Sequence, residues 1–583
     1  MKKLEVLAPA GSKDSFISAV AAGADAIYLG LENFNARKNA QNFTTSEFYA
    51  YSDYARKNNV KVYVTLNTLV KETELPALFK TLNIISNAGV DGVIIQDLGI
   101  LNIIKTYFPN IVCHASTQLA VHNSAGAAFA KKLGFKRVVL ARELSFQEIS
   151  KINGGLAPEL EVFVHGALCF SVSGLCLMSS AIGGFSGNRG LCAQPCRRLY
   201  KCIAGEGYYI SPKDLELSEY ILNLKRAGVA CLKIEGRMKN AEYVYKTVKA
   251  YKLLVVSDES NCGEVLKEAK KFLDSDFARK KTTFNFISKS ADVFSPNAKQ
   301  DLSVTQNPDE SFKDYLKNII SSVKIEKAAK KFTSPILMQT PNPAKPVARR
   351  EKLFVKINDL SWLSVLDKVD VVIIIPANIK NIPAVKNDIF LELPPYIDEQ
   401  NLHLCKNIKG NIIVNNISHF KLLENTGSSL HVGKWLYVTN HFAARHLKKL
   451  NVKSFTYSVE DDIKNISNIA KYISGGMVYL YGLAEVCISK MLNNSLKNNE
   501  TIKSGVDEFC VIKNPNETLL LTKYPTVIFN KKRELLRAGV SDFIIDLSYV
   551  PKDETYLRLL LDAYNLKRPL TGAFSFNMER GLR

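Results

Sequence analysis

Short apolar runs alternate with amphipathic stretches from Leu4 to Arg237, and this alternation constrains the fold more than any other feature of the sequence. Each run has the length of a strand, and the stretches between the runs have the apolar spacing of helices. Strands that alternate with helices form parallel βαβ units. The eight runs are residues 4–9, 26–30, 61–67, 92–96, 111–116, 137–141, 161–165 and 231–234.

Eight such units match the size of a (β/α)8 barrel, which takes about 250 residues. We therefore predict an α/β fold in which residues 1–253 form a TIM-barrel-like domain, with an open doubly wound sheet as the alternative. Residues 254–330 are rich in lysine and lack the alternation, so we predict an inserted or linking subdomain there. Four prolines between Pro335 and Pro346 predict that residues 331–352 form an extended linker.

The alternation of predicted strands and helices returns from Leu353, and two short sequence motifs of the first half recur. Residues 226–229 are repeated as 537–540, and the run 162–166 before Cys169 resembles the run 478–482 before Cys487. These echoes predict that residues 353–583 form a second, degenerate barrel-like repeat without the metal site of the first. Its predicted strands begin at Leu353 and continue at 371–376, 389–393, 411–415, 435–438, 454–458, 477–480, 527–529 and 542–547.

Six of the eleven cysteines lie between Cys169 and Cys231, which indicates a metal site. Four of them, in the segment 161–202, have the spacing C-x₆-C-x₁₅-C-x₃-C: Cys169, Cys176, Cys192 and Cys196. Four sulfur ligands fit an iron–sulfur cluster or zinc, and ordinary thiols are the third possibility. Structural zinc usually has tighter C-x₂₋₄-C pairs, so the spacing favours the cluster. Because Cys169 follows the seventh strand, the site is expected at the barrel mouth.

Candidate catalytic residues lie beside this quartet. Lys233, Glu235 and Arg237 alternate at the end of the eighth run, and His165 ends the seventh. Arg237 could bind a carboxylated donor while Glu235 orients Arg237 or Lys233. An internal ion-pair network that closes the barrel is an equally good interpretation.

The formal net charge is +21, so the chain should attract polyanions, and RNA is the leading macromolecular partner. A lysine-rich composition without functional meaning is the alternative. No apolar run approaches the length of about 20 residues that a membrane helix needs, and we expect a cytoplasmic protein without a membrane partner. The peptidase motifs H-E-x-x-H and G-x-S-x-G are missing from the sequence.

Five segments together resemble the U32 peptidase family: LEVLAPAG at 4–11, GADAIYLG at 23–30, STQ at 116–118, the quartet segment 161–198 and KIEGR at 233–237. Members of this family were named collagenase-like proteases, whereas other branches are oxygen-independent hydroxylases that carry a four-iron four-sulfur cluster. Those branches act on tRNA uridine, on a cytidine of 23S ribosomal RNA or in ubiquinone synthesis. The length of this chain is most similar to the ribosomal RNA branch.

The resemblance implies that the quartet holds a 4Fe–4S cluster and that prephenate is a possible hydroxyl donor. It leads us to expect an RNA hydroxylase that modifies a pyrimidine, with a 23S rRNA cytidine as the first candidate and a tRNA uridine as the second. A U32 peptidase is the first alternative function. A non-catalytic RNA- or ribosome-binding module, in which the cluster only holds the fold together, is the second.

Overall fold

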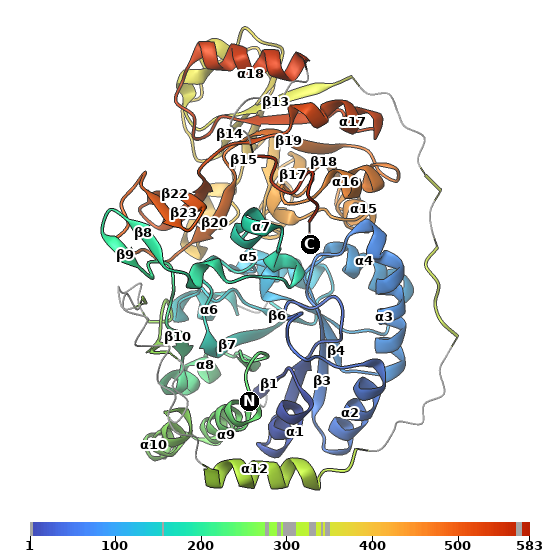
Figure 1. Ribbon diagram of the computed structural model, residues 1–583, viewed down its shortest axis with the longest axis vertical. Helices are drawn as coiled ribbons and strands as arrows, with labels where there is room; N and C mark the ends of the chain where they lie inside the picture. Colours follow the sequence, from blue (N-terminus) through green and yellow to red (C-terminus); the bar gives the residue numbers. More distant parts are fainter. Residues whose placement is uncertain are drawn as a thin grey trace.

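The computed structural model describes residues 4–153, 157–274, 279–287, 293–294, 310–325, 334–339, 342–343, 350–566 and 574–582. Within them the chain forms two closed parallel barrels, which are stacked along the long axis of the molecule (Figure 1). The predicted α/β, TIM-barrel-like fold is confirmed for both halves. Closure of each sheet rules out the open doubly wound alternative.

The first barrel contains all eight predicted strands. Its last strand pairs in parallel with both the first and the seventh, which closes the sheet. The strands are β1 (Glu5–Ala10), β2 (Ala26–Leu29), β3 (Lys61–Leu66), β4 (Gly92–Ile95), β5 (Cys113–Ala115), β6 (Arg137–Val139), β7 (Glu159–Ala167) and β11 (Cys231–Ile234). Two short strands, β10 (Asp214–Glu216) and β12 (Lys281–Thr282), extend the sheet beyond the end of β7.

Local signals in the sequence set where the surrounding helices begin and end. Thr44 and Glu47 form a capping box at the start of α2 (Thr45–Lys57), and Gly89 ends α3 (Leu75–Ala88) in the left-handed conformation. The helices bury one face against the strands. The others of this half are α1 (Lys13–Ala21), α4 (Leu98–Tyr107), α5 (Ser124–Lys132), α6 (Phe146–Ile152), α7 (Met178–Gly183), α8 (Ile221–Arg226) and α9 (Ala241–Val256).

The predicted linking segment 254–330 is described only in part, and its predicted boundary with the linker at 330/331 lies outside the described residues. Two helices of this segment pack outside the first barrel: α10 (Cys262–Leu273) against α9, and α12 (Glu310–Ser322) against α1. The hydroxyls of Tyr245 and Tyr315 are 3.1 Å apart and join α9 to α12. In Figure 1, α12 lies below α1 and α9, at the end of the molecule far from the second barrel.

The second barrel closes through the pairing of β18 with β19. Its strands are β13 (Lys352–Lys356), β14 (Val372–Pro376), β15 (Ile389–Glu392), β16 (Asn411–Val414), β17 (Ser429–Val432), β18 (Val452–Thr456), β19 (Gly476–Gly482) and β25 (Asp542–Asp546). The helices are α13 (Leu363–Leu366), α14 (Ser418–Leu422), α15 (His441–Lys449), α16 (Ile463–Ala470), α17 (Lys532–Arg537) and α18 (Glu554–Leu566).

Two strand predictions in this half were wrong. The apolar run 435–438 is not a strand: it follows β17 as the 3-10 turn η8 (Lys434–Leu436), and Tyr437 has a positive φ of 44°. Its side chains are apolar because they are buried between the barrels, where the Tyr437 hydroxyl donates to the Gly174 carbonyl at 2.6 Å. The run 527–529 contributes only β24 (Thr526–Val527), which pairs antiparallel with the end of β19 and stays outside the barrel wall.

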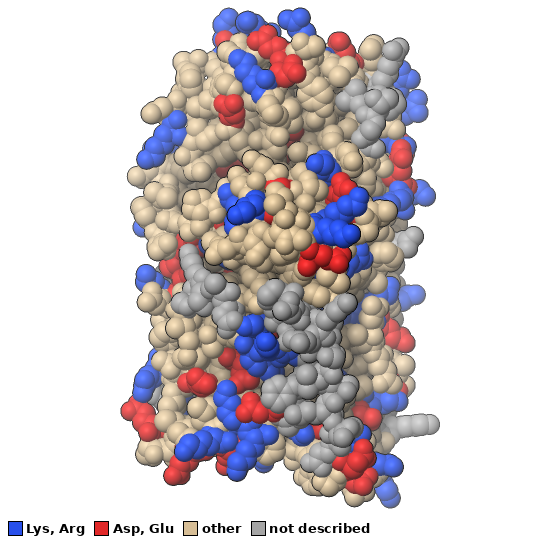
Figure 2. Space-filling view, turned by 60° about the vertical axis from the view of Figure 1, so that its left-hand side comes forward, with Lys and Arg blue, Asp and Glu red and all other residues tan. Residues whose placement is uncertain are grey.

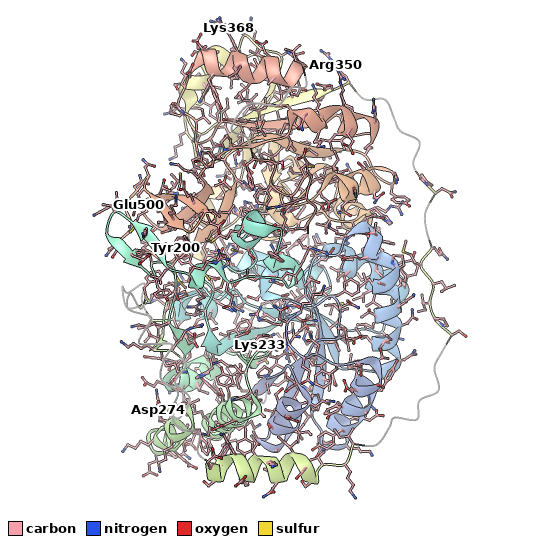
Figure 3. All side chains as sticks on the ribbon, viewed as in Figure 1. Tyr200, Lys233, Asp274, Arg350, Lys368 and Glu500 are labelled. Carbon is pink, nitrogen blue, oxygen red and sulfur yellow. The ribbon has the colours of Figure 1, made fainter. Side chains whose placement is uncertain are left out.

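A third, antiparallel sheet joins the two halves. It combines β8 (Tyr200–Cys202) and β9 (Gly205–Gly207) with β20 (Glu485–Ser489), β21 (Thr501–Ser504), β22 (Asp507–Asn514) and β23 (Glu517–Thr522). The amide of Ile203 donates to Glu500 Oε2 at 3.1 Å across this junction. Tyr200 and Glu500 mark the sheet at the side of the molecule in Figure 3. The cysteine-rich segment is therefore anchored to the second half of the chain.

The barrels face each other mouth to mouth, because the loops at the carboxyl ends of their strands make the contacts. Asn123 caps α5 and donates to the Ile397 carbonyl at 3.0 Å, and Asn440 caps α15 and donates to the Val70 carbonyl at 2.9 Å. The carboxylate of Glu399 accepts from the Ser124 amide at 2.7 Å. In the same way Glu72 accepts from the His441 amide at 2.8 Å. Each contact occurs twice with the halves exchanged, which is the pattern of a two-fold axis.

The described residues contain no helix that is both long and apolar enough to span a membrane.

Candidate functional site

The four predicted cysteine ligands lie near one another in the loops that follow β7. Burial raises the pKa of Cys169, and the thiols of Cys196, Cys176 and Cys192 raise it further because ionised sulfurs would repel one another. Cys192 is exposed and the other three are half-buried. The quartet therefore lies at the mouth of the first barrel, on the side that faces the second barrel.

Backbone amides point at three of these sulfurs. The amide of Gln194 donates to Cys192 Sγ at 3.4 Å. Amides of Met178 and Phe170 bond to Cys176 and Cys196 respectively and lower their pKa values against the effect of burial. Hydrogen bonds of this kind favour the thiolate, which is the form that binds metal.

The quartet is not arranged tightly around one point. Across the described ranges of the chain, no three His, Cys, Asp or Glu side chains converge closely enough to hold a metal ion. A single zinc ion needs its sulfur ligands at about 2.3 Å. The cysteines as they lie do not form that compact arrangement.

A fifth cysteine, Cys487 of β20, touches the quartet. It is fully buried and faces Cys176 across an isolated antiparallel bridge between the two halves. Contact with Cys487, and then burial, raise the pKa of Cys176 well above its ordinary value. The similarity between residues 162–169 and 478–487 was the signal in the sequence. Cys169 and Cys487 each follow the seventh strand of their own barrel. Sequence reasoning nevertheless left Cys487 outside the site.

Two arginines that sequence reasoning missed hold Glu235 beside the quartet. Arg37 Nη2 donates to Glu235 Oε1 at 3.2 Å, and Arg142 Nη2 lies 4.0 Å from Glu235 Oε2. Burial alone would raise the pKa of Glu235, but Arg37 and Arg142 outweigh it, so that the pKa is lowered and the carboxylate stays ionised. The predicted role of Glu235 was to orient Arg237 or Lys233, whereas the structure pairs it with Arg37 and Arg142.

These arginines also act on the cysteines. Arg142 lowers the pKa of Cys169, and the sulfur of Cys192 helps to hold Arg37 in its charged form. Arg37 follows β2 and Arg142 follows β6, so both come from carboxyl ends of strands. That position was the one sign in the sequence that could have identified them.

Arg237 lies in the same mouth and is almost fully buried. Its Nη2 donates to Asn35 Oδ1 at 2.9 Å and to Asn42 Oδ1 at 2.6 Å, and its Nη1 donates to Thr65 Oγ1 at 3.2 Å. Burial lowers the pKa of Arg237 to about 10. Gly30 makes room for it, because a Cβ at that position would lie 2.3 Å from Arg237 Nη2.

Lys233 lies deeper, inside the barrel, where Figure 3 labels it. Its Nζ is 2.7 Å from Glu161 Oε1 and lies 4.5 Å from the centre of the Tyr28 ring. Arg137 continues this buried network by pairing with Glu5 at 2.6 Å. Lys233 thus takes part in the kind of internal ion-pair network that was the alternative interpretation.

His165 points away from the quartet. Its Nδ1 is 3.3 Å from the Tyr251 hydroxyl of α9, and its Nε2 is 3.3 Å from Lys281 Nζ. Burial and the charge of Lys281 lower the pKa of His165 well below its ordinary value, so the ring stays neutral. The structure places it on the outer side of the barrel wall, where α9 packs.

The second half supports the cysteine loops from the other side. Glu460 is fully buried and faces Ser186, Ser180 and Asn188, and burial raises its pKa. The side chain of Asn577 donates to Ser180 Oγ at 2.7 Å and to the Glu460 carbonyl at 2.9 Å. The quartet therefore lies between the two barrels, and of its four cysteines only Cys192 is exposed.

Known proteins resemble part of this chain. The model of peptidase family U32 matches residues 11–293. An uncharacterized protease of Methanocaldococcus jannaschii is 42% identical over 43% of this chain and 65% of its own length. The tRNA hydroxylation protein P of Haemophilus influenzae is 30% identical over 46% and 70% of the two lengths.

The 23S rRNA 5-hydroxycytidine synthase of Escherichia coli is 34% identical over 52% of this chain and 47% of its own length. The chain thus spans less than two thirds of the length of two of these three relatives.

Proposed function

Because the chain belongs to peptidase family U32, we propose that it is an RNA-modifying enzyme that hydroxylates a pyrimidine without molecular oxygen. Two of the three relatives described above carry names that describe RNA hydroxylation. The observation that carries the proposal is the proximity of the quartet to Arg37 and Arg142 at a barrel mouth. The first candidate substrate is a cytidine of 23S rRNA, and a tRNA uridine is the second.

An iron–sulfur cluster fits the residues at this mouth. Four thiols lie near one another, and backbone amides point at three of them. Cys169, Cys176, Cys192 and Cys196 would hold the cluster. When bound, it would supply one-electron chemistry.

The arginines would bind and orient an anionic group of the substrate or donor. Guanidinium groups grip carboxylates and phosphates through paired hydrogen bonds, and burial strengthens that attraction. Glu235 balances only part of the positive charge of Arg37, Arg142 and Arg237. The arginines therefore favour anionic groups at the mouth. These are the thiolate sulfurs of a bound cluster and, beside them, a small carboxylated donor, with prephenate as the candidate, or a phosphate of the RNA.

The net charge of +21 supports RNA as the partner through general attraction. Figure 2 shows basic and acidic side chains interspersed on the face that it presents. On that face the charge would speed the encounter with RNA rather than mark one continuous binding patch.

The decisive experiment measures modified nucleosides by mass spectrometry in ribosomal and transfer RNA from a deletion strain. We expect one 5-hydroxypyrimidine to disappear, to return with the wild-type chain and to stay absent with Cys169→Ser. Cys405→Ser, at a buried cysteine of the second barrel, is the matched control and should restore the nucleoside. Unchanged nucleosides in the deletion strain would contradict the RNA role.

The cofactor is tested separately. Protein purified without oxygen should be brown and contain about four irons per chain. A colourless protein with one zinc would overturn the cluster, whatever the outcome for RNA. Proteolysis is the competing function, and casein cleavage that survives Cys169→Ser would favour it.

A further inference from the structure

Cys176 and Cys487 belong to different barrels and face each other across an antiparallel bridge. The amide of Leu177 donates to the Val486 carbonyl at 2.7 Å, so a hydrogen bond of the bridge lies beside the cysteine pair rather than between its two members. The pair therefore occupies the non-hydrogen-bonded register, in which opposite Cα atoms lie about 4.5 Å apart and side chains are closest. The two thiols are also hydrogen-bonded to each other.

This register meets the geometric requirement of a disulfide, whose Cα atoms usually lie about 4.4–6.8 Å apart. Both cysteines are free thiols in the structure. We propose that Cys176 and Cys487 are a modification site: under peroxide they form a disulfide that links the two barrels.

The chemistry uses hydrogen peroxide as the oxidant. The Cys176 sulfur attacks one peroxide oxygen, the O–O bond breaks, and a sulfenic acid and one water form. The Cys487 sulfur then attacks the Cys176 sulfur, expels the second water and completes the S–S bond. Two thiols are oxidised by two electrons and peroxide is reduced to two waters. Cys176 reacts first because it is half-buried, whereas Cys487 is fully buried. The raised pKa of Cys176 makes this first step slow, because the thiolate is the form that attacks peroxide.

The disulfide has a consequence for the quartet, and this part rests on the proposed function. If Cys176 is a cluster ligand, then the sulfur cannot serve the cluster and the disulfide together. A bound cluster would protect the two cysteines from peroxide. The disulfide, once formed, would prevent the cluster from being loaded again. The pairing of Cys176 with Cys487 itself does not depend on the cluster.

The test maps disulfides in the full-length chain. Protein purified without oxygen, with and without bound iron, is treated with hydrogen peroxide, alkylated in denaturant and digested without reductant for mass spectrometry. We expect a peptide pair joined through Cys176 and Cys487, at least fivefold more abundant in iron-free protein. The pair should disappear in Cys487→Ala and persist in Cys405→Ser, which removes a buried cysteine elsewhere in the second barrel.

Peroxide-treated wild-type protein in which Cys487 is fully alkylated would overturn the proposal, whether Cys176 is then overoxidised or linked to Cys192 or Cys196. This result does not require any variant to fold. The iron content of the same samples reports on the cluster. If protein purified without oxygen never contains iron and still forms the Cys176–Cys487 link, the cluster is overturned and the disulfide stands.

Discussion

At the scale of single residues, the packing of the barrel mouth depends on Gly30, which has no side chain. Gly30→Ala would place a Cβ 2.3 Å from Arg237 Nη2, so Arg237 must move and weaken its bonds to Asn35 and Asn42. We expect a loss of about 1–3 kcal/mol in the free energy of unfolding, the usual cost of overpacking a buried site. Thermal unfolding measures it.

The matched control is Gly263→Ala in α10, where an added Cβ meets nothing within 4 Å. An alanine there should leave the midpoint of unfolding unchanged or raise it slightly. Equal midpoints for the two variants would show that Arg237 is not held as the structure has it.

The buried carboxyl of Asp461 gives the protein a pH dependence. Burial raises the pKa of Asp461 from 3.8 to about 7, so between these values the folded chain binds a proton that the unfolded chain has lost. This contribution to stability is therefore lost as the pH rises from about 4 to 7. Asp461→Asn should flatten the dependence of the unfolding midpoint on pH in this window. Asp370→Asn, at a highly exposed carboxylate, should leave the dependence as in the wild type.

At the scale of elements, the helix-capping side chains of Asn123 and Asn440 hold the barrels together. The side chain of Asn440 caps α15 and also donates to the Val70 carbonyl and to Asp97 Oδ2 at 2.8 Å in the first barrel. Asn440→Ala should cost about 2–4 kcal/mol, because a cap is lost and buried acceptors are left without a donor. Thr44→Ala removes an exposed cap from α2 and should cost only about 1 kcal/mol. Similar melting shifts for both variants would refute a role of Asn440 across the interface.

The strands of the first barrel could be predicted because each apolar run forms one strand of the barrel wall. The run 435–438 failed because its apolar side chains are buried between the barrels, and a burial pattern alone does not reveal which surface is covered. The quartet was visible as a spacing within one segment. Arg37, Arg142 and Cys487 were not, because they reach the site from other strands or from the other barrel, and only the closed fold brings them together.

At the scale of the whole molecule, neither barrel is complete alone. Residues 1–253 without the second half would expose α4, α5 and the cysteine loops, including the Phe129 ring, which stacks on Phe420 at 5.2 Å. We expect this fragment to aggregate and co-expression with residues 350–583 to restore a soluble complex. Size-exclusion chromatography measures both. A monomeric 1–253 fragment that unfolds cooperatively would show that the barrels are independent.

The exchanged contacts between the barrels have a consequence for the origin of the chain. A surface that contacts its own counterpart through a two-fold axis is what a homodimer of single barrels would bury. Gene duplication and fusion of such a dimer would yield this arrangement directly. Fused copies are free to diverge, and one can lose its cysteine loop while still covering the mouth of the other. The second barrel then corresponds to the partner subunit of such a dimer, within the same polypeptide.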